Sequence, residues 1–201
     1  MLRFIGFYDY TVVLTYMSLI SSVLGMVLAR REAFGAAVIC LAVAGLCDAF
    51  DGTVARTKKN RTEDEKNFGI QLDSLCDVVS FGVFPAFLCH CMGIRSIAGI
   101  LLLCGYCVCA VIRLAFFNVL EAKRQKTEGG SNKVYRGLPV TTVSILLPVL
   151  FLLRSFLPRV LFQILLHLLP AVVGFFFILD IPVKKPSLKR VVQRRHRTET
   201  E

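Results

Sequence analysis

Long apolar stretches, separated by short polar segments, run through most of the chain. A helix needs about 20 mainly apolar residues to cross roughly 30 Å of hydrocarbon. Six stretches reach this length and are predicted to span a membrane: 10–29, 33–52, 69–92, 97–119, 138–157 and 160–182. The first lacks the small-residue cleavage site of a signal peptide, so we interpret it as a span. The third is the least regular, because it contains Asp73 and Asp77.

The composition agrees with this pattern. Of the 201 residues, 55% are apolar, whereas soluble domains have about 45–50%. We therefore expect an all-α integral membrane protein, a polytopic bundle of six transmembrane helices formed by residues 1–183. Residues 184–201 are rich in lysine and arginine and are expected to form a basic cytoplasmic tail.

The basic residues are distributed unevenly between the loops. Six spans place both termini on one side of the membrane, and that side carries 18 lysines and arginines against five on the other. Cytoplasmic loops carry such an excess of positive charge. The termini and the 56–66 loop are thus predicted to be cytoplasmic. The net charge of +10 reflects this topology, and no binding to nucleic acid is expected.

Eight cysteines raise the question of a metal site or of disulfides. Most of them lie inside predicted spans, where a thiol packs as a small apolar group. The Cys-His-Cys stretch at 89–91 and the single Cys-x-x-Cys lack a second ligand pair at zinc spacing. Neither a structural zinc site nor a disulfide framework is predicted.

Four aspartates interrupt the apolar pattern near the cytoplasmic ends of the second and third spans. Asp48 and Asp51 are three residues apart, and Asp73 and Asp77 are four apart, so each pair shares one helix face. Four carboxylates cannot share a low-dielectric site without a counter-charge, because burying each ion is costly. Lysine and arginine are scarce in the spans, and hard divalent ions prefer carboxylate oxygens. The four aspartates are therefore predicted to bind Mg²⁺ or Mn²⁺, and a pair of ions would suit displacement at phosphorus.

The residues after Asp51 indicate what such ions would hold. Gly52 and Ala55 remove side-chain bulk, so a ligand can approach the backbone, and Arg56 offers a charged fork suited to phosphate oxygens. Together they predict a diphosphate site at the cytoplasmic edge of the membrane. A lone D-x-x-D-G stretch is a weak signal, since acids at helix ends are often only solvated. The combined spacing D-x2-D-G-x2-A-R followed by G-x3-D-x3-D is far more specific.

The stretches DAFDGTVAR (48–56) and GIQLDSLCD (69–77) resemble the signature of the CDP-alcohol phosphotransferases. These membrane enzymes move a substituted phosphate group from a CDP-linked donor onto an alcohol, and their six-span layout is also similar. The loop at 57–68 is longer than is usual in the family. Because the additional residues are polar, we expect a longer cytoplasmic loop that leaves both acidic helix faces intact.

The resemblance also implies roles for individual residues. It implies metal ligation by Asp48, Asp51, Asp73 and Asp77, of which Asp77 would also be the general base. It implies contacts with the CDP group from Gly52, Ala55, Arg56 and Ser18. Ser18 stands where the family often has an asparagine in a T-x-x-N pattern of the first helix. It further implies a homodimer, because related enzymes are commonly dimeric.

The stretches QLDSLCDVVSFGVFPA, RLAFFNV and YRGLPVTT resemble the phosphatidylserine synthase branch of this family. This resemblance implies CDP-diacylglycerol as the donor and L-serine as the acceptor, with Arg113 and Asn118 binding the acceptor. Serine brings a carboxylate into a partly desolvated site, and Arg113 is the only basic residue well inside a predicted span. Arg113 can instead pair with an aspartate. Phe116 replaces an arginine often found in this pattern, so glycerol 3-phosphate and inositol phosphate stay open as acceptors.

A cation transporter is the alternative from a different class, because intramembrane acids also bind transported ions. Such a protein has no need of small residues and an arginine beside its cation site. The expected chemistry is therefore metal-assisted displacement at phosphorus. In it, a carboxylate takes the proton of the attacking hydroxyl and CMP leaves.

Overall fold

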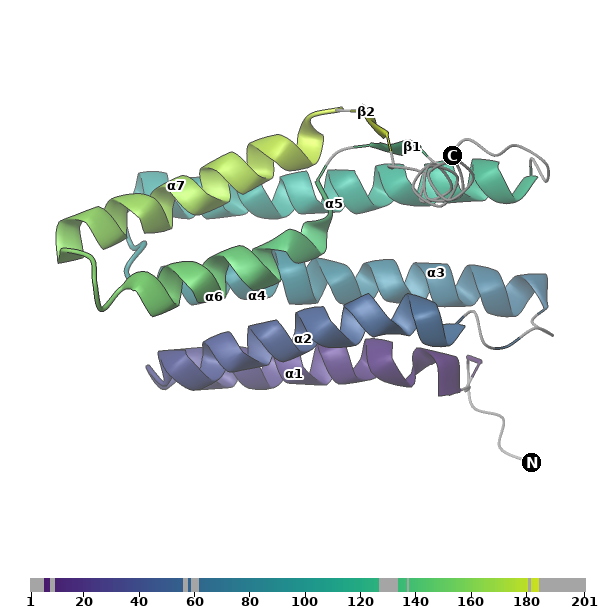
Figure 1. Ribbon diagram of the computed structural model, residues 1–201, viewed down its shortest axis with the longest axis horizontal. Coiled ribbons are helices and arrows are strands. Elements are labelled where there is room, and N and C mark those ends of the chain that lie inside the picture. The colour runs from purple at the N-terminus through teal and green to yellow at the C-terminus, as the bar shows by residue number, and fades with distance from the viewer. Residues whose placement is uncertain are drawn as a thin grey trace, which may run out of the picture.

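The computed structural model describes residues 6–7, 10–55, 58, 62–126, 134–136, 138–180 and 182–184. Its α-helices are α1 (Val13–Arg30), α2 (Phe34–Ala55), α3 (Glu63–Asp77), α4 (Phe84–Cys91), α5 (Ile97–Lys126), α6 (Val143–Leu153) and α7 (Arg159–Ile178). The 3-10 turns η1 (Tyr10–Val12) and η3 (Val140–Thr142) precede α1 and α6, and the π-helical segment η2 (Val78–Val83) joins α3 to α4. The helices lie side by side along the long axis of the molecule (Figure 1).

Helices occupy the six stretches that the hydrophobic pattern predicts, which confirms an all-α polytopic membrane fold. Five stretches are long and apolar enough to cross a membrane: Val13–Arg30, Phe34–Val54, Glu63–Cys91, Ile97–Ala122 and Arg159–Ile178. The third of these is continuous through α3, η2 and α4, and it begins well before the predicted boundary at residue 69. The first part of α3 and the last part of α5 project beyond the other helices at the same end of the bundle (Figure 1).

The fifth predicted span, 138–157, is shorter in the structure. Its apolar helix covers Val140–Leu153, which is about 21 Å at 1.5 Å per residue and less than the roughly 30 Å of hydrocarbon. Pro139 directly precedes its first turn, and the helix ends at Leu153, five residues before Pro158, which precedes α7. The helix packs one face against α2, α4 and α7, and its other face, which carries Ile145 and Leu152, is exposed.

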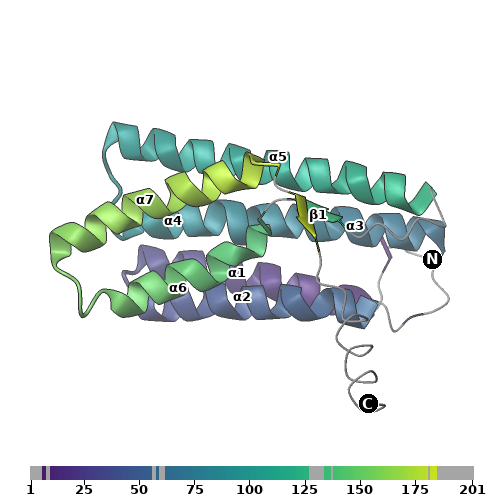
Figure 2. The same cartoon turned by 45° about the horizontal axis from the view of Figure 1, so that its top comes forward.

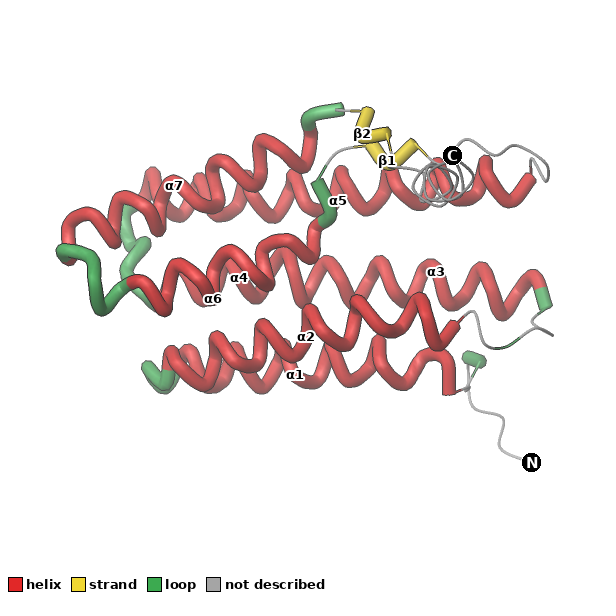
Figure 3. Tube along the Cα trace, in the orientation of Figure 1, coloured by secondary structure: helices red, strands yellow, loops and turns green. Residues whose placement is uncertain are grey.

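A small antiparallel ladder is an addition that the all-α prediction did not include. The strands β1 (Val134–Arg136) and β2 (Pro182–Lys184) pair with Tyr135 opposite Val183. They join the segment between α5 and α6 to the segment that follows α7 (Figure 3). The predicted boundary between the bundle and the basic tail, after residue 183, falls inside β2. The tail itself lies outside the described residues.

Close packing of α1 against α2 follows from the residues on the face of α1 that points inward. All of them are small, and they recur at helical spacing: Thr15, Ser18, Ser22, Gly25 and Ala29. Small residues let the backbones of two membrane helices approach closely. Hydroxyl groups of α1 then reach the backbone of α2, as Ser21 Oγ does when it donates to Cys40 O at 2.9 Å. The two helices therefore form one unit.

The other helices complete a core that is covered by apolar outer faces. Phe81, Phe84 and Leu147 are fully buried between the helices, and α7 lies along α5 (Figure 2). Large apolar side chains cover the outer surface, for example Ile39 and Leu101, which are 64% and 66% exposed. Such a surface is suited to contact with lipid tails rather than water.

Candidate functional site

The last turns of α2 carry the first pair of aspartates. Asp51 is buried and Asp48 is partly buried, and both belong to a helix whose C-terminal end lies near the start of α3. The small-residue face of α1 brings a hydroxyl group to this point. Thr15 Oγ1 donates a hydrogen bond to Asp51 Oδ2 at 3.3 Å in a buried position. Asp51 is thus held from the neighbouring helix.

A capping box determines where the helix with the second pair begins. Thr62 Oγ1 accepts a hydrogen bond from the Glu65 backbone N–H at 3.2 Å, and Glu65 Oε2 accepts one from the Thr62 N–H at 3.0 Å. This reciprocal arrangement satisfies two free donors of the first turn. Asp73 and Asp77 consequently lie deep inside the helix rather than at its start, and Asp77 is buried.

The two pairs of aspartates meet between α2 and α3. One carboxylate oxygen from each of Asp48, Asp73 and Asp77 lies within 4.8 Å of the others. The Asp48 side chain is also within hydrogen-bonding range of Asp77, and Asp51 is within that range of Asp73. The sequence spacing places each pair on a helix face, and the fold turns these two faces toward each other.

This cluster fits a divalent cation. Asp73 Oδ1 is buried and has no hydrogen-bond partner, although such an atom normally finds one. Among the described residues, no lysine or arginine forms an ion pair with the four aspartates. Carboxylate oxygens are the preferred ligands of Mg²⁺ and Mn²⁺. A cation placed here would supply the missing partner and offset the mutual repulsion of the carboxylates.

The residues predicted to contact a nucleotide are only partly described. Gly52 is exposed, and a Cβ added there would meet no atom within 4 Å, so the surface beside Asp51 is open. Ala55 is the last residue of α2. Its side chain, and all of Arg56, lie outside the described residues, so their contacts stay predictions.

Ser18, the other residue predicted to contact the nucleotide, lies inside the bundle. It is only 3% exposed, and its hydroxyl donates to Ala44 O at 3.2 Å and to Ser80 Oγ at 3.5 Å. These contacts tie α1 to α2 and to η2. This hydroxyl is thus buried and bonded inside the bundle, and a nucleotide contact from Ser18 stays a prediction.

The two residues predicted to bind the acceptor point to different neighbours. Asn118 Oδ1 accepts a hydrogen bond from Ser74 Oγ at 2.8 Å, so it faces α3. Arg113 is partly buried, and it interacts electrostatically with Asp180, which lies just beyond α7. Arg113 therefore has an aspartate neighbour, but one outside the cluster of four.

The position of Arg113 along the long axis of the bundle follows from contacts between α5 and the continuous helix Glu63–Cys91, called the acidic helix here because it carries Asp73 and Asp77. Asn118 meets Ser74, and the Tyr106 hydroxyl donates to Phe81 O. The two helices are antiparallel, so the part of α5 between residues 106 and 118 lies level with the part of the acidic helix between residues 74 and 81. The contacts of Asn118 with Ser74 and of Ala110 with Gly82 therefore place Arg113 level with the first residues of η2, within one helical turn of Asp77.

Comparison with known proteins places this site in a family. Residues 11–177 match the pattern described as CDP-alcohol phosphatidyltransferase. The chain belongs to the CDP-alcohol phosphatidyltransferase family. The matched region contains all four aspartates, together with Arg113 and Asn118.

Several curated proteins are similar to this member of the family. The CDP-diacylglycerol–serine O-phosphatidyltransferase of Saccharomyces cerevisiae is 38% identical over 114 residues, which are 55% of this chain and 40% of the relative. The archaetidylserine synthase of Methanothermobacter thermautotrophicus is 36% identical over 130 residues, or 62% and 50%. The CDP-diacylglycerol–serine O-phosphatidyltransferase of Methanocaldococcus jannaschii is 31% identical over 132 residues, or 66% and 56%. The chain thus spans about half the length of these relatives.

Two residues that support the aspartates were not predicted from the sequence. Thr15 bonds to Asp51, and Ser74 links the acidic helix to α5. The small-residue periodicity of the first span could have indicated that Thr15 faces inward, because it lies three residues before Ser18 on the same face. No comparable pattern identifies Ser74.

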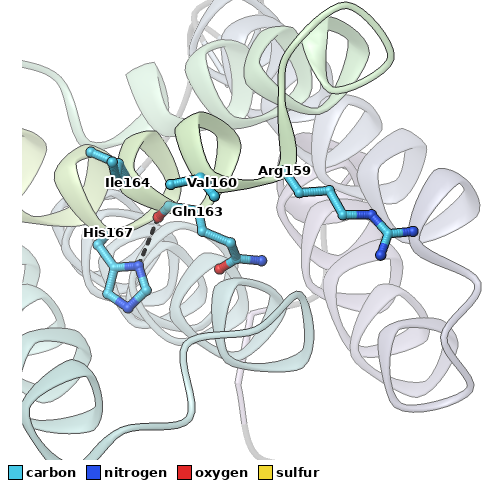
Figure 4. A pocket seen from close by; sticks show the side chains of 5 residues that line it. All are labelled: Arg159, Val160, Gln163, Ile164 and His167. Atoms are coloured by element: carbon cyan, nitrogen blue, oxygen red, sulfur yellow. Dashed lines mark hydrogen bonds between the residues drawn. The ribbon is translucent and has the colours of Figure 1, made fainter.

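A pocket of about 540 Å³ lies elsewhere, along the first turns of α7. Its lining residues are Arg159, Val160, Gln163, Ile164 and His167 (Figure 4). His167 Nδ1 bonds to Gln163 O at 2.7 Å, and Gln163 Nε2 donates to Met92 O at 3.2 Å. The pocket is at the end of the bundle where α7 begins, far from the end of α2 (Figure 1). It is not part of the aspartate cluster.

Replacing Thr15 by valine tests the support of Asp51. Valine keeps the shape of threonine but removes the donor to Asp51 Oδ2. Residues that orient a metal ligand typically affect metal affinity by about 10–100-fold, so we expect Mn²⁺ binding to weaken by about tenfold. The measurement is a titration of purified protein with Mn²⁺, followed by electron paramagnetic resonance of the free ion.

Ser21→Ala is the matched control, since it also removes a hydrogen bond from α1 to α2, but one that ends on the Cys40 carbonyl. It should leave the Mn²⁺ affinity unchanged. Equal losses in both variants would show that Thr15 acts only through helix packing.

Proposed function

We propose that this chain transfers the phosphatidyl group of CDP-diacylglycerol to the hydroxyl of L-serine, forming phosphatidylserine and releasing CMP. The observation that carries the proposal is that Asp48, Asp73 and Asp77 meet in one cluster between α2 and α3, with Asp51 beside Asp73. Membership in the family supports the CDP-linked donor. The names of the similar proteins support serine as the acceptor.

The four aspartates would hold the metal in this reaction. Mg²⁺ or Mn²⁺, proposed as two ions, would neutralise the diphosphate and the charge that develops on the departing CMP. Gly52 leaves space beside Asp51 for the nucleotide. Ala55 and Arg56 are proposed to contact the CDP group, with the guanidinium of Arg56 binding phosphate oxygens.

Asp77 is proposed as the general base as well as a ligand. It lies farthest from the start of α3 among the acids of that helix, next to Asp48. A carboxylate in this position takes the proton from the serine hydroxyl as its oxygen closes on the phosphorus that carries diacylglycerol. The bond between that phosphorus and the oxygen of CMP breaks, and CMP leaves with the bonding electrons.

Arg113 is proposed to bind the carboxylate of serine, with Asn118 beside it. Its position within one helical turn of Asp77 supports this role, because the hydroxyl and the carboxylate of serine are only a few bonds apart. The charge of Asp180 acts on Arg113, so both signs of charge are present here. Such a pair suits a zwitterionic amino acid better than a phosphorylated alcohol, which would need a denser cationic site.

The setting in the cell is also a proposal. The helices and the family support an integral membrane protein. We propose that both termini and the aspartate cluster face the cytoplasm, because the basic loops lie on that side. Residues 1–183 would form the catalytic unit, residues 184–201 a basic tail, and two copies a homodimer.

Release of CMP by purified protein in detergent tests the function. With CDP-diacylglycerol, Mn²⁺ or Mg²⁺ and L-serine, CMP and phosphatidylserine should form in equal amounts, and a chelator should stop the reaction. Asp77→Asn should lower turnover by about 10²–10⁴-fold, because it removes the base, with a modest loss of donor binding.

Asp64→Asn is the control for this assay, since Asp64 is an exposed acid in the first turn of the same helix. It should turn over like the wild type. Release of CMP with glycerol 3-phosphate or inositol phosphate, but not with serine, would contradict the proposed acceptor. No CMP release with any acceptor would contradict the reaction class.

Arg113→Ala tests the placement of the acceptor. Loss of a charged hydrogen bond to the serine carboxylate should raise the KM for serine by about tenfold or more, while the KM for CDP-diacylglycerol changes little. Steady-state kinetics with each substrate varied in turn measure both constants. Arg95→Ala, at the other end of the bundle, should change neither of them. An equal rise in both constants for Arg113→Ala would count against the placement.

A further inference from the structure

The helix that carries Asp73 and Asp77 changes its geometry immediately after Asp77. Residues Val78–Val83 form a π-helical turn, in which the Phe84 N–H bonds to Val79 O. The cause lies in Pro85, which has no N–H and whose ring would collide with the carbonyl of Phe81, four residues earlier. A wider turn relieves this collision. Such turns are uncommon and occur frequently at functional sites.

The same proline leaves the Phe81 carbonyl without its usual partner inside the helix. The hydroxyl of Tyr106, on α5, supplies one by donating to Phe81 O at 2.5 Å. Tyr106 is only 3% exposed, and its ring packs against Phe177 of α7 with 5.7 Å between centroids. A buried carbonyl without a hydrogen-bond partner destabilises the folded state. The bond from Tyr106 therefore fixes the position of the π-helical turn against α5.

A second contact lies beside the first. Cys107 Sγ donates to Gly82 O at 3.6 Å, and a Cβ at Gly82 would be 3.4 Å from Ala110 Cβ. These two distances show that α5 lies directly against the widened turn at Gly82. Side chains of α5 thus hold the backbone that follows Asp77 at two carbonyls, in addition to the π-helical bonds of the turn itself.

A third contact holds the helix on the other side of Asp77. Ser74 Oγ donates to Asn118 Oδ1 at 2.8 Å. Asp77 thus lies between two residues of the acidic helix that form hydrogen bonds with α5, namely Ser74 and Phe81. Two contacts, one on each side of Asp77, fix both the rotation of the helix about its axis and its shift along that axis. A single contact would leave either the rotation or the shift undetermined.

We infer that Tyr106 is a positioning residue, which acts through the Phe81 carbonyl and the π-helical turn to hold the carboxylate of Asp77 toward Asp48 and Asp73. The inference rests on the proposed function of this cluster. Functional groups must be held within about 0.5 Å of their productive positions, and a displacement of about 1 Å can lower a rate by roughly 100-fold. A tyrosine that fixes the turn next to the proposed base meets this requirement.

Tyr106→Phe tests the inference, because it removes the hydroxyl and keeps the ring against Phe177. We expect the affinity of the purified protein for Mn²⁺ to fall by about tenfold and serine-dependent CMP release to fall by at least as much. Mn²⁺ binding is read by electron paramagnetic resonance without any substrate. Thermal unfolding in the same detergent reports stability separately. A drop in unfolding temperature with unchanged Mn²⁺ affinity would reduce Tyr106 to a packing role and overturn the inference.

Two further variants make the test specific. Tyr16→Phe removes a hydroxyl from α1, and it should leave the Mn²⁺ affinity as in the wild type. Pro85→Ala restores a backbone N–H four residues after Phe81, so the carbonyl regains a partner within its helix. In that background, Tyr106→Phe should weaken Mn²⁺ binding by less than about threefold. An undiminished loss would contradict the route through the Phe81 carbonyl.

These measurements separate this inference from the proposed function. If the wild type releases no CMP with serine, but Tyr106→Phe still weakens Mn²⁺ binding, the proposed reaction fails and the positioning role stands. If serine-dependent turnover is present and Tyr106→Phe changes neither Mn²⁺ affinity nor turnover, the positioning role alone is wrong.

Discussion

The mutual repulsion of four carboxylates inside a membrane protein is the constraint on which the rest of this structure depends. Asp48 and Asp51 on α2 face Asp73 and Asp77 on α3, and because Asp51 and Asp77 are buried and the other two partly buried, water screens their charges only weakly. Such an arrangement is stable only if a cation or protons offset the charge. The unpartnered Asp73 Oδ1 favours a cation, because bound protons alone would leave this atom without a partner. We therefore place the function of the chain in this cluster.

The neighbouring helices can be understood as the frame that keeps these carboxylates together. The small residues of α1 allow it to approach α2 closely enough for Thr15 to reach Asp51. On the opposite side, α5 holds the acidic helix at Ser74 and at Phe81. The acids thus lie on two helices that are each supported by a third element. A preorganised site of this kind needs little rearrangement when a charged substrate binds.

Much of this arrangement could be predicted from the sequence, and the exceptions have physical reasons. The hydrophobic pattern predicts six helical stretches, and the helical spacing of the aspartates predicts two acidic faces. The boundary of α3 differs because a local capping box at Thr62 extends the helix into a polar segment. The burial of Ser18 was not predicted, because it follows from the close packing of α1 on α2. The Phe81 carbonyl in the π-helical turn before Pro85 accepts a hydrogen bond from a hydroxyl of α5, and a pattern within one helix does not reveal such a partner.

Anomalous X-ray scattering from crystals grown with Mn²⁺ tests the central claim most directly. The account predicts strong anomalous density between the carboxylates of Asp48, Asp51, Asp73 and Asp77, within coordination distance of their oxygens. The density should disappear when the crystals are soaked in a chelator. Carboxylates that hydrogen-bond to one another around an empty centre, in crystals that bind Mn²⁺ elsewhere, would contradict it.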